Sequence, residues 1–152
     1  MPTPFGVVGV RTAGDAVAEI AYLPRSAGAL APRNALAERA CRQIERYLED
    51  PRFRWDLPLA PAGSEFRRRV WRGISAIPAG ETRSYGELAR SVGSAPRAVG
   101  QACGDNPFPL VVPCHRVVAA DGLGGFAHSG ARFELSVKRW LLAHEGAPIQ
   151  HA

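Results

Sequence analysis

The sequence predicts an α/β fold in two parts, a small N-terminal α/β lobe followed by a mainly helical C-terminal domain. Residues 6–10 and 16–22 form two apolar runs separated by a Gly-Asp turn, a pattern typical of paired β-strands. The Pro- and Ala-rich segment 57–63 is typical of a linker, and beyond it apolar side chains recur at helical spacing. We therefore expect one domain at residues 1–62 and a second at residues 63–152.

The N-terminal lobe is expected to contain a helix and a third strand in addition to the two paired strands. The helix should start near Arg33, just after a proline, and run to Leu48, because its apolar side chains fall mostly three or four residues apart. Segment 53–57, with two aromatic residues, is a candidate for the third strand. This lobe contains no constellation of catalytic residue types, so we expect its role to be structural.

The C-terminal domain carries start and stop signals for successive helices. Ser64 can cap a first helix, and the spacing of Ser84 and Glu87 matches a capping box that opens a second one. Gly93 is a plausible end for the second helix, and a third helix is expected at residues 94–104. Two short helices separated by a tight glycine turn make a helix-turn-helix, a common DNA-docking unit.

A short motif, Pro113-Cys114-His115-Arg116, follows the predicted helix-turn-helix after a loop with two prolines. The apolar run 110–112 predicts a short buried strand that places the cysteine and histidine at its end. A cysteine is a useful nucleophile only as thiolate, and a neighbouring base or positive charge supplies that form near neutral pH. The motif therefore predicts a nucleophilic thiol, and the chain then closes with a helix expected at residues 133–144.

Composition and charge narrow the class of protein. The net charge of +5 and the 11 Lys and Arg against 7 Asp and Glu in residues 63–152 favour a polyanionic partner. No apolar stretch reaches the length of a membrane span and no signal peptide is evident, so we predict no membrane partner and a cytoplasmic location. The three cysteines form no CxxC pair and the histidines add no ligand spacing, so neither a disulfide framework nor a metal site is predicted.

Residues 64–147 resemble the 6-O-alkylguanine-DNA alkyltransferases, also called methylated-DNA–protein-cysteine methyltransferases. Order and spacing agree as well as residue types. The matching motifs are Ser84-Tyr85, Arg97-Ala98-Val99-Gly100, Asn106-Pro107, Pro113-Cys114-His115-Arg116-Val117-Val118 and Trp140-Leu141-Leu142-Ala143-His144-Glu145-Gly146. The resemblance implies a ribonuclease-H-like N-terminal α/β lobe and a winged-helix-like C-terminal domain that binds DNA and transfers the alkyl group.

The chemistry implied by the resemblance is direct reversal of DNA damage. Cys114 would accept an alkyl group from the 6-oxygen of guanine in one substitution step, so each molecule reacts once. His115 would act as base through a bridging water, and Glu145 would polarise His115. Tyr85 would donate a hydrogen bond to the departing guanine, and Asn106 would fix the hinge before the cysteine. No cofactor is needed, because the damaged base is the donor and the protein is the acceptor.

The resemblance also implies how DNA is held. Guanine's alkylated oxygen is buried in the duplex, so the nucleotide is flipped out, here from the minor groove, and Arg97 would fill the space that it leaves. The implied partner is double-stranded DNA containing alkylated guanine, bound by a monomer that is nucleoid-associated when on DNA. The implied DNA contacts are Tyr85, Ser94, Arg97, Ala98 and Arg116. The implied substrate-pocket residues are Val117, Phe126 and Ser129.

Two other functions remain as alternatives. A non-catalytic sensor would bind and flip alkylated guanine without chemistry, but such relatives commonly carry tryptophan where this chain has Cys114. A cysteine hydrolase or thiol peptidase would use the thiol, but it would have no need for the helix carrying Arg97 or for a basic C-terminal half. Both alternatives are distinguished from alkyl transfer by whether the thiol is modified permanently.

Overall fold

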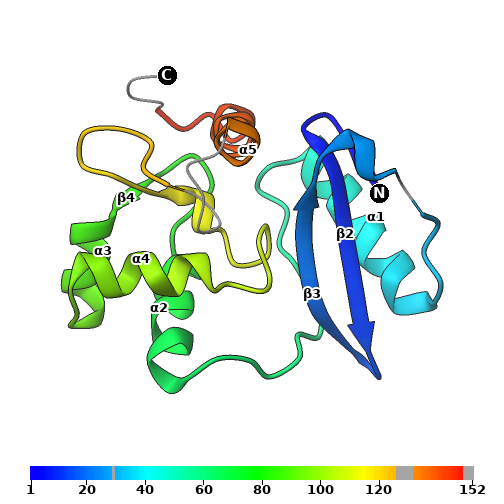
Figure 1. The fold of residues 1–152 in the computed structure, drawn as a ribbon, viewed down its shortest axis with the longest axis horizontal. Helices are drawn as coiled ribbons and strands as arrows, with labels where there is room; N and C mark the ends of the chain where they lie inside the picture. The colour runs from blue at the N-terminus through cyan, green and yellow to red at the C-terminus, as the bar shows by residue number, and fades with distance from the viewer. Residues whose placement is uncertain (29, 126–131, 149–152) are drawn as a thin grey trace. The chain divides into compact units, whose positions relative to one another are not determined.

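The computed structural model describes residues 1–28, 30–125 and 132–148, and the chain divides into two compact units (Figure 1). The first unit is Met1–Pro61 and the second is Ala62–Ala152. Within the described ranges the fold is α/β, with five α-helices and a small antiparallel sheet. This agrees with the fold class expected from the sequence.

The first unit is built on an antiparallel sheet. Its strands are β1 (Pro2–Thr3), β2 (Gly6–Ala13) and β3 (Ala16–Leu23), in the order β1-β2-β3. The two strands predicted from the sequence are confirmed, and Gly14 has φ of +59° in the turn between them, a conformation that favours glycine. Strand β1 was not predicted, because two residues are too few to show an alternating pattern.

Helix α1 (Ala35–Glu49) packs on β2 and β3 with the face that carries Ala37, Ala40, Ile44 and Tyr47. The helix begins two residues later than predicted, because the side chain of Asn34 accepts a hydrogen bond from the amide of Ala37 and so caps it. A short 3₁₀ helix, η1 (Arg25–Ala27), precedes it. The helix contributes apolar side chains to the core of this unit.

The prediction of a third strand at residues 53–57 is wrong. The amide of Asp56 donates to the side-chain oxygen of Gln43 at 2.9 Å, and the Gln43 amide donates to the Asp56 carbonyl at 2.8 Å. Both backbone hydrogen-bonding groups of Asp56 are therefore taken by a side chain of α1 rather than by a neighbouring strand. The aromatic residues that suggested a strand contact each other instead, with the rings of Phe53 and Trp55 5.6 Å apart.

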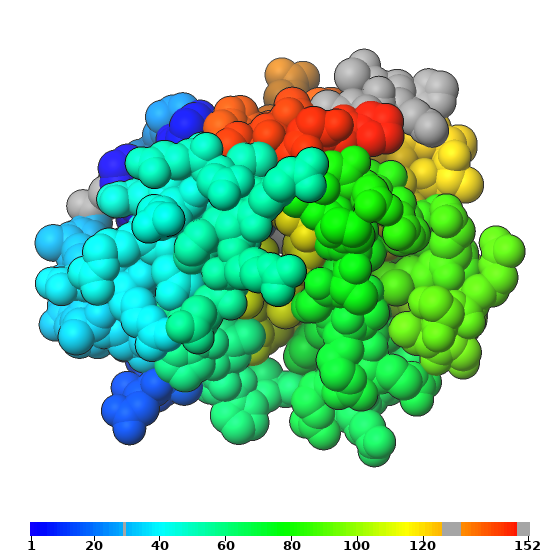
Figure 2. Space-filling model, turned by 180° about the vertical axis from the view of Figure 1, so that it is seen from behind, coloured from blue at the N-terminus to red at the C-terminus, as the bar shows by residue number. Residues whose placement is uncertain are grey.

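The second unit contains the helix-turn-helix expected from the sequence. Its first three helices are α2 (Glu65–Ser75), α3 (Tyr85–Val92) and α4 (Pro96–Gly104), each in contact with the other two. Ser64 caps α2, and Ser84 with Glu87 forms the predicted capping box at the start of α3. Gly93 ends α3 in the left-handed conformation, with φ of +70°. The space-filling view in Figure 2 shows these helices, in green to yellow-green, at the surface of this unit.

The strand predicted before the cysteine is wrong, and the strand lies after it. Residues 110–112 form a turn in which the amide of Val112 donates to the Phe108 carbonyl, and Leu110 has φ of +74°. Cys114–Arg116 then forms a 3₁₀ helix, η2, and β5 (Val117–Val118) pairs in parallel with β4 (Arg83–Ser84). The flanking prolines lack the amide hydrogens that a strand would need, so the apolar run folds into a tight turn.

Helix α5 (Arg132–His144) packs against η2 and closes the second unit (Figure 1). Its buried residues are Val137, Lys138, Leu141 and Leu142. On the other side, the indole N–H of Trp71 in α2 donates to the carbonyl of Ala102 in α4 at 2.8 Å. The first contact joins the cysteine segment to the last helix, and the second joins α2 to α4.

Candidate active site

The thiol of Cys114 is buried at the start of η2, where only 5% of the residue is exposed. The side-chain amide of Asn106 donates to its sulfur at 3.2 Å and also to the carbonyl of Val112 at 2.9 Å. The side-chain oxygen of Asn106 accepts from the Phe108 amide at 2.9 Å. One asparagine therefore fixes both the loop after α4 and the position of the cysteine sulfur.

The surroundings of Cys114 favour the protonated thiol over the thiolate. A hydrogen bond with the Cys103 side chain, together with burial, raises the pKa of Cys114 well above its ordinary value. The sulfur also lies 3.6 Å from the carbonyl oxygen of Cys103, which accepts its hydrogen. A nucleophilic role consequently requires a base that removes the proton during the reaction.

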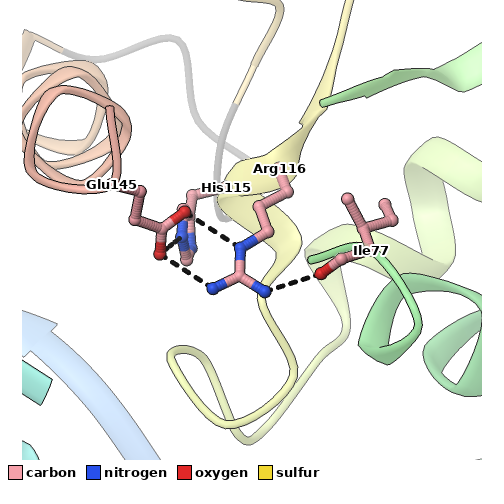
Figure 3. A network of polar contacts seen from close by, with 4 residues as sticks. All are labelled: Ile77, His115, Arg116 and Glu145. Atoms are coloured by element: carbon pink, nitrogen blue, oxygen red, sulfur yellow. Dashed lines mark hydrogen bonds and ion pairs between the residues drawn. The ribbon is translucent and has the colours of Figure 1, made fainter. Parts of the chain in front are cut away.

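A buried network of charged and polar groups, drawn in Figure 3, starts at His115, the residue after Cys114 in the chain. Nε2 of His115 lies 2.8 Å from Oε2 of Glu145, and the Arg116 guanidinium donates to both carboxylate oxygens at 2.9 Å. The remaining amino group of Arg116 donates to the carbonyl of Ile77 at 2.7 Å. Glu145 follows α5 directly, so the network ties η2 both to that helix and to the end of α2.

His115 is set up as a neutral base. Burial lowers its pKa below the ordinary 6.5, although Glu145 acts in the opposite direction. Since Glu145 is a charge-paired carboxylate, it accepts a hydrogen from Nε2, which leaves a lone pair on Nδ1. Nδ1 is buried and has no hydrogen-bond partner among the described residues. The ring can therefore accept a proton at Nδ1, while Glu145 stabilises the resulting cation.

Lys138 is a site residue that the sequence analysis missed. It is fully buried, and its Nζ donates to the carbonyls of Val117 at 2.8 Å and Gly125 at 2.9 Å. Burial lowers its pKa to about 8, while the nearby thiols Cys103 and Cys114 raise it. The sequence did contain an indication of this role. Lys138 is the single lysine among the 19 basic residues, and it lies on the apolar face of the last helix.

Tyr85 lies at the start of α3, and its hydroxyl donates to the Gly125 carbonyl at 3.3 Å. Burial raises the pKa of Tyr85, so the hydroxyl stays protonated and available as a donor. Gly124 packs against the ring: a Cβ there would stand 3.0 Å from a ring carbon, and its φ is +75°. Lys138 and Tyr85 thus converge on the carbonyl of Gly125.

The remaining predicted site residues within the described ranges lie outside the buried network of His115, Arg116 and Glu145. Arg97 is exposed in the first turn of α4, and Ser94 and Ala98 beside it are half-buried. Val117 is completely buried within β5. The predicted pocket residues Phe126 and Ser129 lie outside the described residues.

The structure argues against the predicted DNA contact of Arg116. Its side chain is 11% exposed, and its guanidinium is held by Glu145 and the Ile77 carbonyl. A guanidinium paired in this way inside the protein cannot reach a phosphate without breaking the network. Arg116 therefore supports the carboxylate that orients His115.

The second unit also contains a cavity of about 210 Å³ that is separate from the cysteine and the buried network. It is lined by Thr82, Ser84, Glu87, Val118, Ala119, Ala120, Gly122, Leu123, Leu142 and Pro148. Cys114, His115 and Glu145 do not line this cavity, so we do not assign it to the candidate active site.

Among the described residues, no three His, Cys, Asp or Glu side chains are grouped to hold a metal ion. None of the helices in the described ranges is long and apolar enough to cross a membrane.

The second unit thus combines a buried cysteine next to a histidine with a helix-turn-helix that precedes them in the chain. This combination is typical of a DNA-binding protein that uses a cysteine thiol in its chemistry. The sequence model described as "6-O-methylguanine DNA methyltransferase, DNA binding domain" matches residues 65–147. The chain belongs to this family, the methylated-DNA–protein-cysteine methyltransferases.

Individual relatives agree with this assignment. The methylated-DNA–protein-cysteine methyltransferase of Methanosarcina acetivorans is 47% identical over 111 residues, 71% of this chain and 68% of the relative. That of Mycolicibacterium paratuberculosis is 52% identical over 109 residues, 70% of this chain and 63% of the relative. The aligned stretches thus span about two thirds of each relative.

Solved structures extend the similarity across both units. The crystal structure of Mycobacterium tuberculosis O6-methylguanine methyltransferase has a TM-score of 0.79 at 33% identity, over 97% of this chain and 92% of that chain. A crystal structure of the M. tuberculosis OGT protein in complex with DNA has a TM-score of 0.78 at 35% identity, over 97% of this chain and 93% of that chain.

Proposed function

We propose that this protein repairs DNA by moving an alkyl group, typically methyl, from the 6-oxygen of guanine onto the sulfur of Cys114. The observation that carries the proposal is the buried thiol of Cys114, held by Asn106 and followed in the chain by His115, whose ring is bonded to Glu145. Membership of the methyltransferase family supports the same reaction. The thioether product is stable, so each molecule acts once.

The described side chains suggest how the protons move. His115 takes the thiol proton at Nδ1 through a bridging water, and Glu145 stabilises the cation that forms. The sulfur attacks the alkyl carbon as the bond from carbon to the guanine oxygen breaks, and the electron pair leaves with guanine. The hydroxyl of Tyr85, which donates to the Gly125 carbonyl in this structure, would exchange that hydrogen bond for one to the departing base. Asn106 holds the sulfur in position by its hydrogen bond.

The substrate of the proposed reaction is double-stranded DNA that contains alkylated guanine. The exposed Arg97, in the first turn of α4, is suited to enter the duplex from the minor groove and occupy the place of the flipped nucleotide. Ser94 lies in the turn just before α4, and Ala98 follows Arg97 within the helix. The similarity to a DNA-bound structure supports DNA as partner.

We assign DNA binding and alkyl transfer to residues 63–152, as a winged-helix-like domain that acts as a monomer. Residues 1–62 would form a ribonuclease-H-like lobe with a structural role. The positions of Cys114, His115, Asn106 and Glu145, all in the second unit, support this division. A cytoplasmic location, on the nucleoid when DNA is bound, stays a prediction.

Intact-protein mass spectrometry after incubation with a duplex containing one methylated guanine tests the proposed function. We expect a gain of one methyl group per protein molecule, which peptide mapping should assign to Cys114. Tight binding to the duplex with no gain in mass would replace the proposal with the non-catalytic sensor. A protein that neither binds nor gains mass would contradict both functions.

Replacing Arg97 by alanine should separate base flipping from chemistry. We expect the repair rate on duplex DNA to fall by about tenfold to a hundredfold, because the space left by the flipped nucleotide is no longer filled. Reaction with free benzylguanine, which needs no flipping, should stay near the wild-type rate. Single-turnover rates on both substrates make the comparison.

Arg139→Ala is the matched control for this substitution, because Arg139 is also exposed but lies on α5. We expect its duplex repair rate to change much less than that of Arg97→Ala. Equal losses of Arg97→Ala on duplex DNA and on free benzylguanine would contradict a role of Arg97 in flipping.

A further inference from the structure

A second cysteine contacts the proposed nucleophile. Cys103 lies in the last turn of α4, and its side chain is close enough to that of Cys114 for the two thiols to shift each other's pKa, lowering that of Cys103 and raising that of Cys114. The sulfur of Cys114 is also 3.6 Å from the backbone oxygen of Cys103. Both cysteines are free. The helix-turn-helix therefore places a thiol directly against the reactive one, although ten residues separate them in the sequence.

We propose that Cys103 and Cys114 form a reversible disulfide when the protein meets a peroxide, and that this bond switches off alkyl acceptance. The inference rests on the proposed function, because it concerns the regulation of the same sulfur. Disulfides in reducing compartments are usually transient and redox-sensing, which fits a bond of this kind.

The accessibility of the two thiols gives the order of the steps. Cys103 is half-buried, whereas Cys114 is buried. The neighbouring Cys114 side chain and the charge of Lys138 lower the pKa of Cys103, against the effect of its own burial. Thiolate character and exposure determine which cysteine a peroxide oxidises first. Cys103 is therefore the thiol that reacts with peroxide, and Cys114 is the one that resolves the product.

The chemistry balances with hydrogen peroxide as the oxidant. The Cys103 thiolate attacks one peroxide oxygen, the O–O bond breaks, and hydroxide leaves as the sulfenic acid forms. The Cys114 sulfur then attacks the Cys103 sulfur, the S–O bond breaks, and the thiol proton leaves with the hydroxyl as water. Two thiols are oxidised to one disulfide, and one peroxide is reduced to two waters. A dithiol reductant reverses the bond by exchange.

The disulfide would have two effects on the proposed reaction. The electron pair with which Cys114 attacks the alkyl carbon is used in the S–S bond, and this bond links α4 covalently to η2. It also keeps the nucleophile away from irreversible oxidation, because a disulfide is reducible whereas a sulfinic acid is not. A protein that is consumed by one reaction would thereby be preserved during oxidative stress.

The test uses the full chain in a Cys41→Ser background, which removes the cysteine of the first unit. After treatment with one equivalent of hydrogen peroxide and quenching by a thiol-alkylating reagent, the protein is cut with trypsin and with a protease that cleaves before aspartate. Trypsin leaves residues 98–116 as one peptide, and cleavage before Asp105 divides it between the two cysteines. We expect the two fragments to remain joined without reductant and to separate with dithiothreitol.

Activity is measured on the same samples. We expect peroxide to abolish methyl acceptance from a methylated duplex, and dithiothreitol to restore it to the untreated level. In Cys103→Ser, compared with its own untreated activity, one equivalent of peroxide should remove much less methyl acceptance, because the thiol that reacts first with peroxide is absent and the Cys114 thiol is buried with a raised pKa. Separate fragments in the peroxide-treated protein, or an equal and dithiothreitol-reversible loss in Cys103→Ser, would overturn the proposal. Because the fragment mapping needs no activity, joined fragments in a protein without methyl acceptance would refute the proposed function and leave the disulfide standing.

Discussion

Replacing Cys114 by serine should abolish methyl transfer while leaving the fold and lesion binding in place. Serine keeps a polar atom for the Asn106 amide, so we expect the free energy of unfolding to change by no more than about 1 kcal/mol. The hydroxyl is far less acidic than a thiol, and its oxygen is a weaker nucleophile toward an alkyl carbon than sulfur, so the neighbouring His115 should not bring it to transfer. Intact-protein mass spectrometry with a methylated duplex should show no added methyl group.

Cys41→Ser is the matched control, because it removes a thiol from the first unit. We expect this variant to accept one methyl group as the wild-type protein does. Methyl transfer that persists in Cys114→Ser would contradict the assignment, and mapping it to Cys103 would show that the neighbouring thiol is the acceptor. An electrophoretic shift assay on the methylated duplex should show that Cys114→Ser still binds.

Replacing Glu145 by glutamine should lower both stability and activity, because the change leaves the Arg116 guanidinium buried without its counter-charge. Removing one partner of a buried ion pair typically destabilises a protein by about 3–5 kcal/mol. The Glu145 side chain is fully buried and its two oxygens accept three hydrogen bonds, so we expect a value in this range. Urea denaturation followed by tryptophan fluorescence measures it.

The same substitution should slow methyl transfer by about a hundredfold, since glutamine cannot stabilise a protonated His115 by charge. Glu81→Gln is the control, because Glu81 forms an ion pair with Arg83 at the surface, where such a pair contributes at most about 1 kcal/mol. A Glu145→Gln variant as stable as Glu81→Gln would show that the buried network does not support the fold. Wild-type transfer in the folded variant would remove Glu145 from the proposed mechanism.

Local patterns in the sequence predicted the helices of the second unit well. The capping box of Ser84 and Glu87 and the glycine end at Gly93 both depend on hydrogen bonds between residues close in the sequence. The adjacency of Cys114 and His115 is likewise local, and it indicated a nucleophile next to a base before any fold was known. The motif pattern around these residues also led to the correct family.

Two local interpretations failed because apolar or aromatic character alone does not define a strand. In segment 53–57 both backbone groups of Asp56 bond to the side chain of Gln43, and run 110–112 folds into a turn between prolines. The resemblance implied a DNA contact for Arg116, whose guanidinium in the structure is paired with Glu145, 29 residues further along the chain.

The sequence by itself therefore determined the α/β class, the helix-turn-helix and the choice of Cys114 as the proposed nucleophile, because each follows from residues that are neighbours in the chain. Only the tertiary structure placed Lys138 in the interior, paired Arg116 with Glu145 and brought the Cys114 sulfur to 3.6 Å from the backbone oxygen of Cys103. These placements depend on how α4, α5 and η2 pack, and burial of a charged or reactive group is decided by that packing. The sequence therefore determines which chemical groups the site contains, whereas the packing of the fold determines the direction in which their pKa values shift.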